Sequence, residues 1–457
     1  MSLWTSADIA TATDGAASAA FDVSGVTFDS REVVAGDLFI ALTGEATDGH
    51  KFLDQAFDGG AAGAIVSEDT PHPNVRVVDT FAALEGLAKA ARARTDARII
   101  GVTGSAGKTG TKEALFAALD RSPAKRAHRS VKSYNNHTGV PLSLARMPAD
   151  VDYGVFEMGM NHPGELAHLT TLVRPHVAIV TAIAPAHAEF FPDESAIADA
   201  KGEIFQGLEP GGVAIIPYDS PHRDRLAAAA APHAARTVTF GLDQGADVRA
   251  IEMASAVKGG TFVTAQVGDR ELSYTISQPG QHWVSNSLAV LAAVDAVGGD
   301  LALAGLALAE LGGLAGRGER FRVKAGDGSA LIIDEAYNAN PASMRVTLAV
   351  LANEEAGRKI AVLGEMRELG DKSDAYHADL ADPVRDAGVQ SVILVGEKMK
   401  PLAKALEGQV EIVHVPDAAA ARDRLMATID AGDAVLIKGS NGVGLSALVA
   451  ALASGKV

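Results

Sequence analysis

Short apolar runs recur along the chain, and most of them are followed by a segment whose apolar positions have helical spacing. The runs that we interpret as strands read RIIGVTG, YGVFEMG, HVAIVTAIA, GVAIIP, ALIIDEA, KIAVLGE, SVILVGE and AVLIKGS. Strands that alternate with helices in this way are typical of parallel sheets with helices on both faces. The pattern therefore predicts an α/β fold with doubly wound, mostly parallel sheets.

Two breaks in this pattern divide the chain into three predicted domains. Residues 1–96 contain the short runs GDLFIAL, AAGAIVSE and VRVVD and only one clear helix, near residues 81–95, which indicates a small N-terminal α/β domain. The glycine-rich stretch LGGLAGRGER, residues 311–320, interrupts the later series and indicates a hinge. We predict a central domain over residues 97–317 and a Rossmann-like C-terminal domain over residues 318–457.

Composition narrows the classes of function. A chain of 457 residues with 47% hydrophobic residues is long enough for about three cores. The net charge of −17 argues against a general nucleic-acid or anionic-membrane surface, because such surfaces need a basic face. There are no cysteines, which excludes disulfides and thiolate chemistry. The start MSLWTSADIA lacks the features of a signal peptide, and charges and glycines interrupt the apolar stretches, so we expect a cytoplasmic protein without a membrane span.

The stretch TGSAGKTG follows a predicted strand and opens a predicted helix, from Lys108 to Leu119. In such a loop the backbone N–H groups surround phosphate oxygens, Lys108 adds a positive charge and the Thr109 hydroxyl can bind Mg²⁺. The usual motif has its first glycine at the position of Val102, whereas here it is one residue earlier, but the tight part of the loop is complete. The predicted nucleotide contacts are Gly104, Ser105, Ala106, Gly107, Lys108, Thr109 and Gly110.

Other polar residues stand at the ends of apolar strands, the edge where doubly wound folds build their sites. Glu157 ends one such run and could complete the shell of a Mg²⁺ ion held by Thr109 and phosphate oxygens, and His187 follows the next run. Each of them taken alone is more often a solvated loop residue or a satisfied partner than a ligand. Their shared placement at strand ends makes a functional role as well supported as a structural one.

Lys201 lies on the apolar face of a predicted helix, in line with Ile197, Ile204 and Leu208. One interpretation is that its aliphatic stem packs on this face while its amine reaches water. The other is that burial lowers its pKa and leaves a neutral amine. Such an amine could add CO₂ and become a carbamate, which would act as a carboxylate-like metal ligand.

Three further residues each allow two interpretations. Asp334 ends the run ALIIDE and could belong to a Walker B strand of a mechanical ATPase, although the hinge places it in a different domain from Lys108. Arg317 lies inside the hinge, where it could reach phosphates when domains close or serve solubility alone. Asn286 opens a predicted helix, and capping alone could explain it.

The order of these motifs resembles the Mur ligases, the ATP-dependent amide-forming enzymes of peptidoglycan precursor synthesis. The resemblance covers nearly the whole chain. It rests on TGSAGKTGTKE, SYNNHTGVP, EMGMNHPGE, APAHAEFF, DAKGEIF, the asparagine of HWVSN, the arginine of GRGER and IIDEAYNANP. Within the family, EMGMNHPGE, DEAYNANPASM, VLGEMRELG and IKGSNGVG look like the MurF type. The N-terminal stretch FDSREVVAGDLFIALTGEATDGHKF is shared in style with the MurE type, but a DNPR-like motif, expected in MurE, is absent.

The resemblance implies roles for individual residues. Lys108 and Thr109 would hold the β and γ phosphates of ATP and one Mg²⁺ with Glu157, while His187 and a carbamylated Lys201 would serve a second Mg²⁺. Asn286 would contact the adenine region, Arg317 the phosphates and Asp334 the ribose. The residues implied in substrate binding are Ser30 and Arg31 for the UDP-sugar, Asn135 and Asn136 close to the metal centre, and Tyr337, Asn338 and Asn340 for a dipeptide.

The implied reaction joins UDP-MurNAc-tripeptide to D-Ala-D-Ala. The tripeptide carboxylate would attack the γ-phosphoryl group and form an acyl phosphate, which the dipeptide amine then converts into an amide. The resemblance implies a small-molecule enzyme without a nucleic-acid partner, and nothing in the sequence demands more than a monomer. Three alternatives stay open: a MurE-type ligase that adds one amino acid, a folylpolyglutamate synthase, and a P-loop switch or motor.

Overall fold

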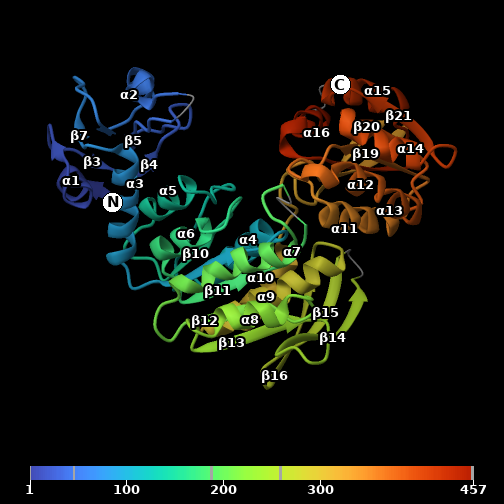
Figure 1. Cartoon of the computed structure of the whole chain (residues 1–457), viewed down its shortest axis with the longest axis horizontal. Coiled ribbons are helices and arrows are strands. Elements are labelled where there is room, and N and C mark those ends of the chain that lie inside the picture. The colour runs from blue at the N-terminus through green and yellow to red at the C-terminus, as the bar shows by residue number, and fades with distance from the viewer. Residues whose placement is uncertain (1, 45–46, 186–188, 257–259, 454–457) are drawn as a thin grey trace.

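The computed structural model describes residues 2–44, 47–185, 189–256 and 260–453. Within these ranges the chain forms three lobes in sequence order, each with its own main sheet, and the middle lobe lies between the other two (Figure 1). The strands of each sheet are mostly parallel and helices cover them, so the predicted α/β class is confirmed. No helix in these ranges is both long and apolar enough to cross a membrane.

The N-terminal lobe is built on the sheet order β2-β7-β6-β5-β4, with one small additional pair, β1-β3. Its strands are β1 Trp4–Thr5, β2 Ala16–Ala17, β3 Asp22–Val23, β4 Gly25–Thr27, β5 Asp37–Ile40, β6 Gly63–Val66 and β7 Asn74–Arg76. Its helices are α1 Ser6–Thr13, the 3₁₀ turn η1 Gly49–Phe52, α2 Leu53–Asp58 and α3 Thr80–Ala93.

The expectation of a single helix in this lobe is wrong. The predicted helix near residues 81–95 is α3, but α1 and α2 also form. Helix α1 is only eight residues long, too short for a clear apolar period, and a capping box between Thr5 and Asp8 starts it. Ile9 is its fully buried apolar residue and fixes it on the core.

The middle lobe has the sheet order β16-β15-β14-β13-β12-β11-β8-β10-β9, in which the pairs from β9 to β14 are parallel. Its strands are β8 Arg98–Thr103, β9 Ala127–Arg129, β10 Tyr153–Glu157, β11 Val177–Val180, β12 Val213–Pro217, β13 Arg236–Gly241, β14 Val248–Ser255, β15 Thr261–Val267 and β16 Arg270–Ile276. Its helices are α4 Lys108–Asp120, α5 Gly139–Ala145, α6 Glu165–Val173, α7 Glu194–Gly202, the 3₁₀ turn η2 Glu203–Gly207, α8 Arg223–Ala230, α9 Gln281–Ala296 and α10 Leu301–Glu310.

This sheet is covered on both faces, as doubly wound folds require. Successive residues of β8 point to opposite sides, so that Ile100 packs with α4, α9 and α10 while Ile99 packs with α5, α6 and the helices that follow α6. Strands β14, β15 and β16 extend the sheet antiparallel to one another. The carboxyl ends of the central parallel strands therefore meet at one edge, beside the start of α4.

The C-terminal lobe has the sheet order β17-β18-β22-β19-β20-β21, parallel except for the β17–β18 hairpin. Its strands are β17 Glu319–Ala325, β18 Gly328–Glu335, β19 Arg358–Gly364, β20 Ser391–Val395, β21 Glu411–Val415 and β22 Asp433–Lys438. Its helices and 3₁₀ turns are α11 Pro341–Ala352, η3 Gly370–Lys372, α12 Ser373–Ala378, α13 Ala381–Asp386, η4 Glu397–Met399, α14 Lys400–Ala405, α15 Ala418–Thr428, η5 Asn441–Val443 and α16 Leu445–Ala453.

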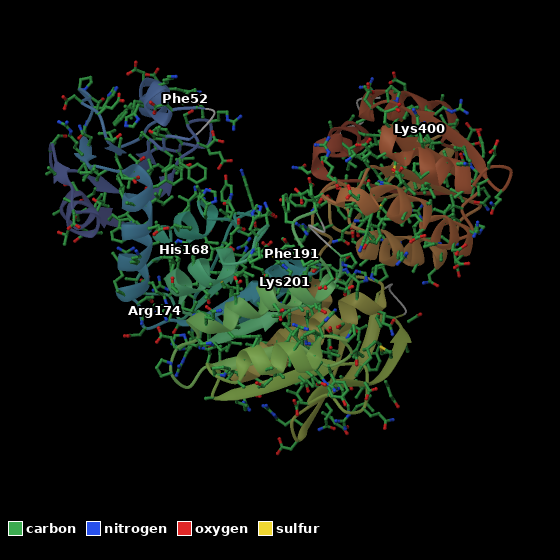
Figure 2. All side chains as sticks on the ribbon, viewed as in Figure 1. Phe52, His168, Arg174, Phe191, Lys201 and Lys400 are labelled. Carbon is green, nitrogen blue, oxygen red and sulfur yellow. The ribbon has the colours of Figure 1, made fainter. Side chains whose placement is uncertain are left out.

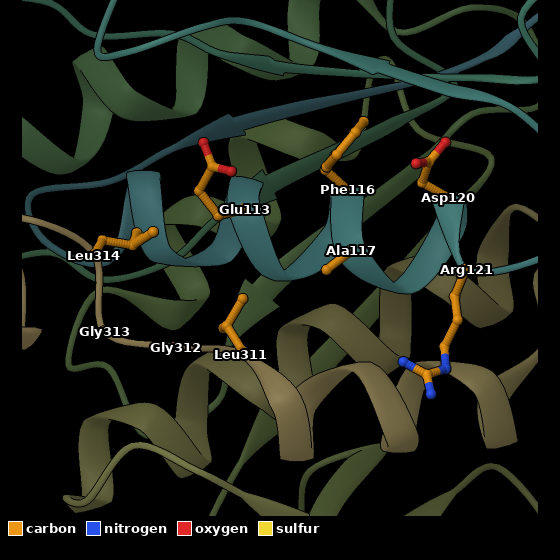
Figure 3. Close-up of a pocket in the computed structure, with 9 residues that line it drawn as sticks. All are labelled: Glu113, Phe116, Ala117, Asp120, Arg121, Leu311, Gly312, Gly313 and Leu314. Carbon is orange, nitrogen blue, oxygen red and sulfur yellow. The ribbon is translucent and has the colours of Figure 1, made fainter.

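A glycine-rich connection joins the middle and C-terminal lobes, between the end of α10 and the start of β17. Gly316 and Gly318 have φ angles of +74° and +89°, which side chains rarely tolerate. Residues 311–314 run beside α4 toward its start and line, together with residues 113–121, an open pocket of about 400 Å³ (Figure 3). None of the loop residues 104–110 lines this pocket, so it belongs to the connection and not to the candidate active site.

Candidate active site

The phosphate loop connects β8 to α4 and has the backbone shape that the sequence predicts. Gly104 and Gly107 have φ angles of +148° and +83°. A side chain at Gly104 would lie 2.0 Å from the Thr181 hydroxyl, so only glycine fits there. Gly107 is the N-cap of α4 and no side chain caps it. The N–H groups of the first turn thus lack a side-chain cap and lie where an anion can accept from them.

Neighbouring strand ends hold this loop in place. The Thr181 hydroxyl donates to the carbonyl of Ala106 at 2.5 Å, and the Ser105 hydroxyl accepts from the N–H of Ala184 at 3.1 Å. Lys108 folds back over the loop and donates to the carbonyl of Gly104 at 2.6 Å. Burial lowers the pKa of Lys108, although the nearby Glu157 carboxylate opposes this effect. An anionic ligand in the loop would restore the charge that burial disfavours.

Glu157 ends β10 beside this loop, as the sequence predicts. It is fully buried, and its two oxygens have different partners: the Thr109 hydroxyl at 2.8 Å and the Asn135 amide at 2.7 Å. The Glu157 backbone N–H donates to Ser130 at 3.1 Å. A hydroxyl and a carboxylate in direct contact next to a phosphate loop are hard oxygen donors, the kind that Mg²⁺ takes together with phosphate oxygens. These residues therefore fit a magnesium ion.

Lys201 lies in α7, in the part of the middle lobe that faces the C-terminal lobe (Figure 2). Its side chain is 1% exposed, so the interpretation in which its amine reaches water is wrong. Burial lowers its pKa well below the usual value, and the neighbouring Lys108 charge acts in the same direction. Burial therefore favours the neutral amine over the ammonium form. The helix that the sequence predicts here continues beyond Gly202 as the 3₁₀ turn η2.

His187 lies outside the described residues. Within the described ranges, no three His, Cys, Asp or Glu side chains form a group that could hold a metal ion by themselves. A metal at Glu157 would therefore depend on non-carboxylate donors, such as Thr109 and phosphate oxygens.

Asn286 lies beside the phosphate loop, but not where the sequence places it. It is the sixth residue of α9, whose N-cap is Gly280, so the explanation of Asn286 as a helix cap is wrong. A Cβ atom at Gly107 would lie 2.8 Å from its Oδ1 atom. Two residues of α9 therefore face the start of α4, because Trp283 makes the same kind of close approach to Gly110.

Arg317 reaches back from the connection toward the middle lobe. It donates to the Ser133 hydroxyl at 3.4 Å, and its guanidinium lies 4.1 Å from the centre of the Tyr337 ring. It also lies near enough to Lys108 to lower the pKa of that lysine. Two cationic side chains, of Lys108 and Arg317, thus lie beside the loop, an arrangement that attracts a polyphosphate.

Asp334 ends β18 in the C-terminal lobe, where it organises the end of the glycine connection. Its carboxylate accepts from the N–H groups of Gly316 at 2.6 Å and Ala336 at 3.0 Å. Burial raises its pKa. Because Asp334 lies in a different sheet from the phosphate loop, a Walker B role on a neighbouring strand is excluded.

Asn340 joins the C-terminal lobe to the phosphate loop. It is the N-cap of α11, and its side-chain amide donates to the Ser105 carbonyl at 3.3 Å. Asn338 precedes it and accepts, through its backbone carbonyl, from the buried Lys438 amine at 2.9 Å. The structure thus brings Asn340 to the loop, with Tyr337 nearby against Arg317.

The remaining predicted residues are Ser30 and Arg31 in the N-terminal lobe and Asn136 in the middle lobe. Ser30 donates to Gln55 at 3.0 Å, and Arg31 pairs with Asp29 at 2.7 Å while its side chain stays 80% exposed. Asn136 accepts from the N–H of Gly139 and shapes the start of α5. These hydrogen bonds and the ion pair join Ser30, Arg31 and Asn136 to residues outside the phosphate loop.

Sequence reasoning missed several buried charges at the site. Lys438 ends β22, and burial lowers its pKa although Glu335 lies 3.5 Å away. Burial also raises the pKa of Glu335. Lys438 stands at the end of the apolar run AVLIKGS, and a charged residue in this position is the same signal that identified Glu157. The fully buried Lys112 in α4 gave no such signal, because a lysine in a helix is ordinary.

These features suit phosphoryl transfer. The loop offers N–H groups without a side-chain cap, Lys108 and Arg317 offer positive charge, and Glu157 with Thr109 offers metal donors. Asn340 contacts Ser105 of the loop and Arg317 contacts Ser133, so the C-terminal lobe and the glycine-rich connection contribute to the site.

Comparison with known proteins agrees with this geometry. Three family descriptions match in sequence order: "Mur ligase family, catalytic domain" over residues 22–102, "Mur ligase middle domain" over 102–294 and "Mur ligase, glutamate ligase domain" over 319–441. The chain is 35% identical to UDP-N-acetylmuramoyl-tripeptide–D-alanyl-D-alanine ligase of Escherichia coli, over 93% of each chain.

Solved structures give the same result. MurF from Acinetobacter baumannii superposes with a TM-score of 0.84 at 30% identity, covering 99% of both chains. The MurF ligase from Thermotoga maritima in complex with ADP has a TM-score of 0.77 at 26% identity, covering 95% of this chain and 98% of that one. With a similarity that extends over nearly its whole length and over all three lobes, the chain belongs to the Mur ligase family.

Proposed function

We infer that the chain is an ATP-dependent ligase that joins UDP-N-acetylmuramoyl-tripeptide to D-alanyl-D-alanine in peptidoglycan precursor synthesis. The observation that carries this inference is the end-to-end similarity to the E. coli ligase of that name, which covers 93% of each chain. A shared fold alone would not carry it, because substrate choice depends on the site. The products would be UDP-N-acetylmuramoyl-pentapeptide, ADP and phosphate.

The phosphate loop would bind the ATP phosphates through residues 104–110. The uncapped N–H groups of α4 support this role, and Lys108, which now contacts its own loop, would turn to the β and γ phosphates. Arg317 would add a second cation. Asn286 would contact the adenine region, since it lies against Gly107, and Asp334 would accept from the ribose.

Two magnesium ions would reduce the repulsion between the tripeptide carboxylate and the triphosphate when bound. Thr109 and Glu157 would hold one of them, a role that their mutual contact supports. His187 and Lys201, as its carbamate, would hold the other. The complete burial of Lys201 supports the carbamate, because a neutral amine can add CO₂ whereas an ammonium group cannot.

The chain's residues would then support two chemical steps. A carboxylate oxygen of the tripeptide attacks the γ-phosphorus, the bond to the ADP oxygen breaks, and an acyl phosphate forms. The free amine of D-alanyl-D-alanine attacks the acyl carbon, phosphate leaves with that oxygen, and the amine loses a proton. Closure of the C-terminal lobe through Asn340 and Arg317 would exclude water, which otherwise hydrolyses the acyl phosphate.

The substrates would divide among three domains, which we propose as residues 1–96, 97–317 and 318–457. Ser30 and Arg31 would bind the UDP-sugar, and Asn135 and Asn136 would lie near the reacting carboxylate. Tyr337, Asn338 and Asn340 would line the dipeptide pocket. One chain supplies all these groups, which supports a monomer, and the nucleotide-linked substrates support a cytoplasmic location.

An acceptor panel tests this function. The protein is incubated with ATP and Mg²⁺, and with UDP-N-acetylmuramoyl-tripeptide, the corresponding dipeptide substrate or neither. Each mixture receives D-alanyl-D-alanine, a single amino acid or no amine, and phosphate release and product mass are measured. We expect release that requires both substrates and gives the pentapeptide. Addition of one amino acid to the corresponding dipeptide substrate would instead indicate a MurE-type ligase, and release that ignores both substrates would indicate a switch or motor.

A further inference from the structure

Residues 130–135, which we call the linking segment, connect the end of β9 with the turn that leads into α5. This short segment contacts groups that belong to three parts of the molecule. Ser133 accepts from Arg317 of the connection, and Asn135 donates to Glu157 in the metal site. Lys132 and Tyr134 both reach the N-terminal lobe. No role in the proposed function accounts for the last two contacts.

A buried lysine fixes the base of the linking segment. The Lys112 amine donates to the carbonyls of Ser130 at 3.0 Å and Lys132 at 2.7 Å, and its side chain is fully buried. The Ser130 hydroxyl accepts from the N–H of Glu157. The segment is therefore attached both to the helix that follows the phosphate loop and to the strand that carries Glu157.

One carboxylate of the N-terminal lobe holds the other side of the linking segment. Glu32 forms an ion pair with Lys132 and accepts from the Tyr134 hydroxyl at 3.1 Å. Lys132 has a φ angle of +52°, a backbone conformation that a side chain at this position disfavours. The Tyr134 ring also lies 5.9 Å from the Phe28 ring. Contacts from Glu32 thus oppose relaxation of a strained backbone.

Glu32 also lies next to the residues that we propose for substrate binding. It directly follows Ser30 and Arg31, which we propose to bind the UDP-linked substrate. The body of the N-terminal lobe is fixed separately, since Trp4 donates to the Ala145 carbonyl and Arg94 to the Met147 carbonyl. Glu32 therefore acts on the loop that carries it and on the linking segment, and not on the placement of the whole lobe.

We propose that Glu32 is a positioning residue that couples the UDP-substrate loop to the metal site through the linking segment. Substrate at Ser30 and Arg31 orders Glu32, Glu32 orders Lys132 and Tyr134, and Asn135 then holds the Glu157 carboxylate in the orientation that binds magnesium–nucleotide. Occupation of one site strengthens binding at the other, and by linkage the effect is reciprocal. This proposal rests on the proposed function for the identity of the substrate.

The first test needs no substrate. Amide hydrogen exchange is measured on the ligand-free protein and on Glu32→Ala, with Asp69→Ala as the control, because Asp69 forms an exposed ion pair with Arg76 inside the N-terminal lobe. We expect faster exchange in residues 130–136 for Glu32→Ala and wild-type exchange for the control. Wild-type exchange in Glu32→Ala, or equal acceleration in both variants, would overturn the proposal.

The second test measures the coupling itself. The dissociation constant of magnesium–ADP is determined by calorimetry with and without UDP-N-acetylmuramoyl-tripeptide. We expect the substrate to tighten ADP binding about fivefold in the wild type and in Asp69→Ala, and not in Glu32→Ala. Glu32→Gln, which keeps the acceptor oxygen for Tyr134, should retain part of the coupling.

The outcomes separate this proposal from the proposed function. Equal coupling in the wild type and Glu32→Ala would overturn the positioning role and leave the ligase function intact. Failure of the UDP-linked substrate to bind the wild type would overturn the proposed function, and the exchange experiment would still decide whether Glu32 orders the linking segment.

Discussion

At the scale of single residues, Glu157 offers the sharpest test of the proposed metal site. Its two oxygens already contact Thr109 and Asn135, so Glu157→Gln can keep much of this geometry while it removes the charge. We expect amide formation to slow about 100-fold and the Mg²⁺ concentration for half-maximal rate to rise, because a neutral amide binds Mg²⁺ weakly. Glu209→Gln, which loses ion pairs far from the loop, serves as the control and should stay near the wild-type rate.

Substitution of Lys201 tests whether this lysine is carbamylated. Because burial lowers its pKa, the amine is neutral above that pKa and can hold CO₂, and it protonates and loses CO₂ as the pH falls. We expect added bicarbonate to raise activity in CO₂-depleted buffer, a carbamate signal with ¹³C-labelled bicarbonate, and at least a 100-fold loss in Lys201→Ala. Full activity in Lys201→Ala that is unchanged by CO₂ would contradict the carbamate.

At the scale of elements, the sequence predicts those parts whose signal is local. The loop from Gly104 to Thr109 could be predicted because its glycines, lysine and threonine are close together in the sequence. Glu157 could be predicted because it is a charged residue at the end of an apolar strand. The position of Asn286 beside Gly107 could not be predicted, because it depends on packing between two helices that are far apart in the sequence. The antiparallel extension from β14 to β16 and the short helix α1 have weak local patterns and were missed.

Strand β9 gives a prediction about pH and stability. Its His128 bonds to the Ser143 carbonyl of α5 at 2.8 Å, and burial lowers the pKa of His128 to about 4. The unfolded chain takes up a proton near pH 6.5 and the folded chain does not, so stability falls as pH falls from about 6.5 to about 4. In the wild type this histidine lowers the free energy of unfolding by on the order of 3 kcal/mol over this pH range, and in His128→Gln this loss should be absent.

The free energy of unfolding is measured by denaturant titration at a series of pH values. Hydrogen exchange in β9 and α5 is then measured over the same pH range. The exposed His233 provides the matched control, and His233→Gln should keep the slope of the wild type. A His128→Gln variant with the same pH dependence as the wild type would mean that burial of this ring costs nothing.

At the scale of the whole molecule, Asn340 connects the C-terminal lobe to the phosphate loop. In Asn340→Asp the carboxylate can still cap α11, but it cannot donate to the Ser105 carbonyl and repels it. We expect unchanged unfolding stability, an ATP KM raised about tenfold and a larger radius of gyration in solution scattering, because closure becomes weaker. Gln409→Glu makes the same chemical change at an exposed site far from the loop and should alter none of these values.

The fate of one oxygen atom tests the central claim most directly. If the three lobes assemble a site in which ATP is used to make an amide, then the tripeptide carboxylate must attack the γ-phosphorus and lose one oxygen to phosphate. UDP-N-acetylmuramoyl-tripeptide labelled with ¹⁸O in its terminal carboxylate is incubated with ATP, Mg²⁺ and D-alanyl-D-alanine, and the released phosphate is analysed by mass spectrometry. The account predicts one ¹⁸O atom in each phosphate and one in each new amide, whereas phosphate without label would contradict it.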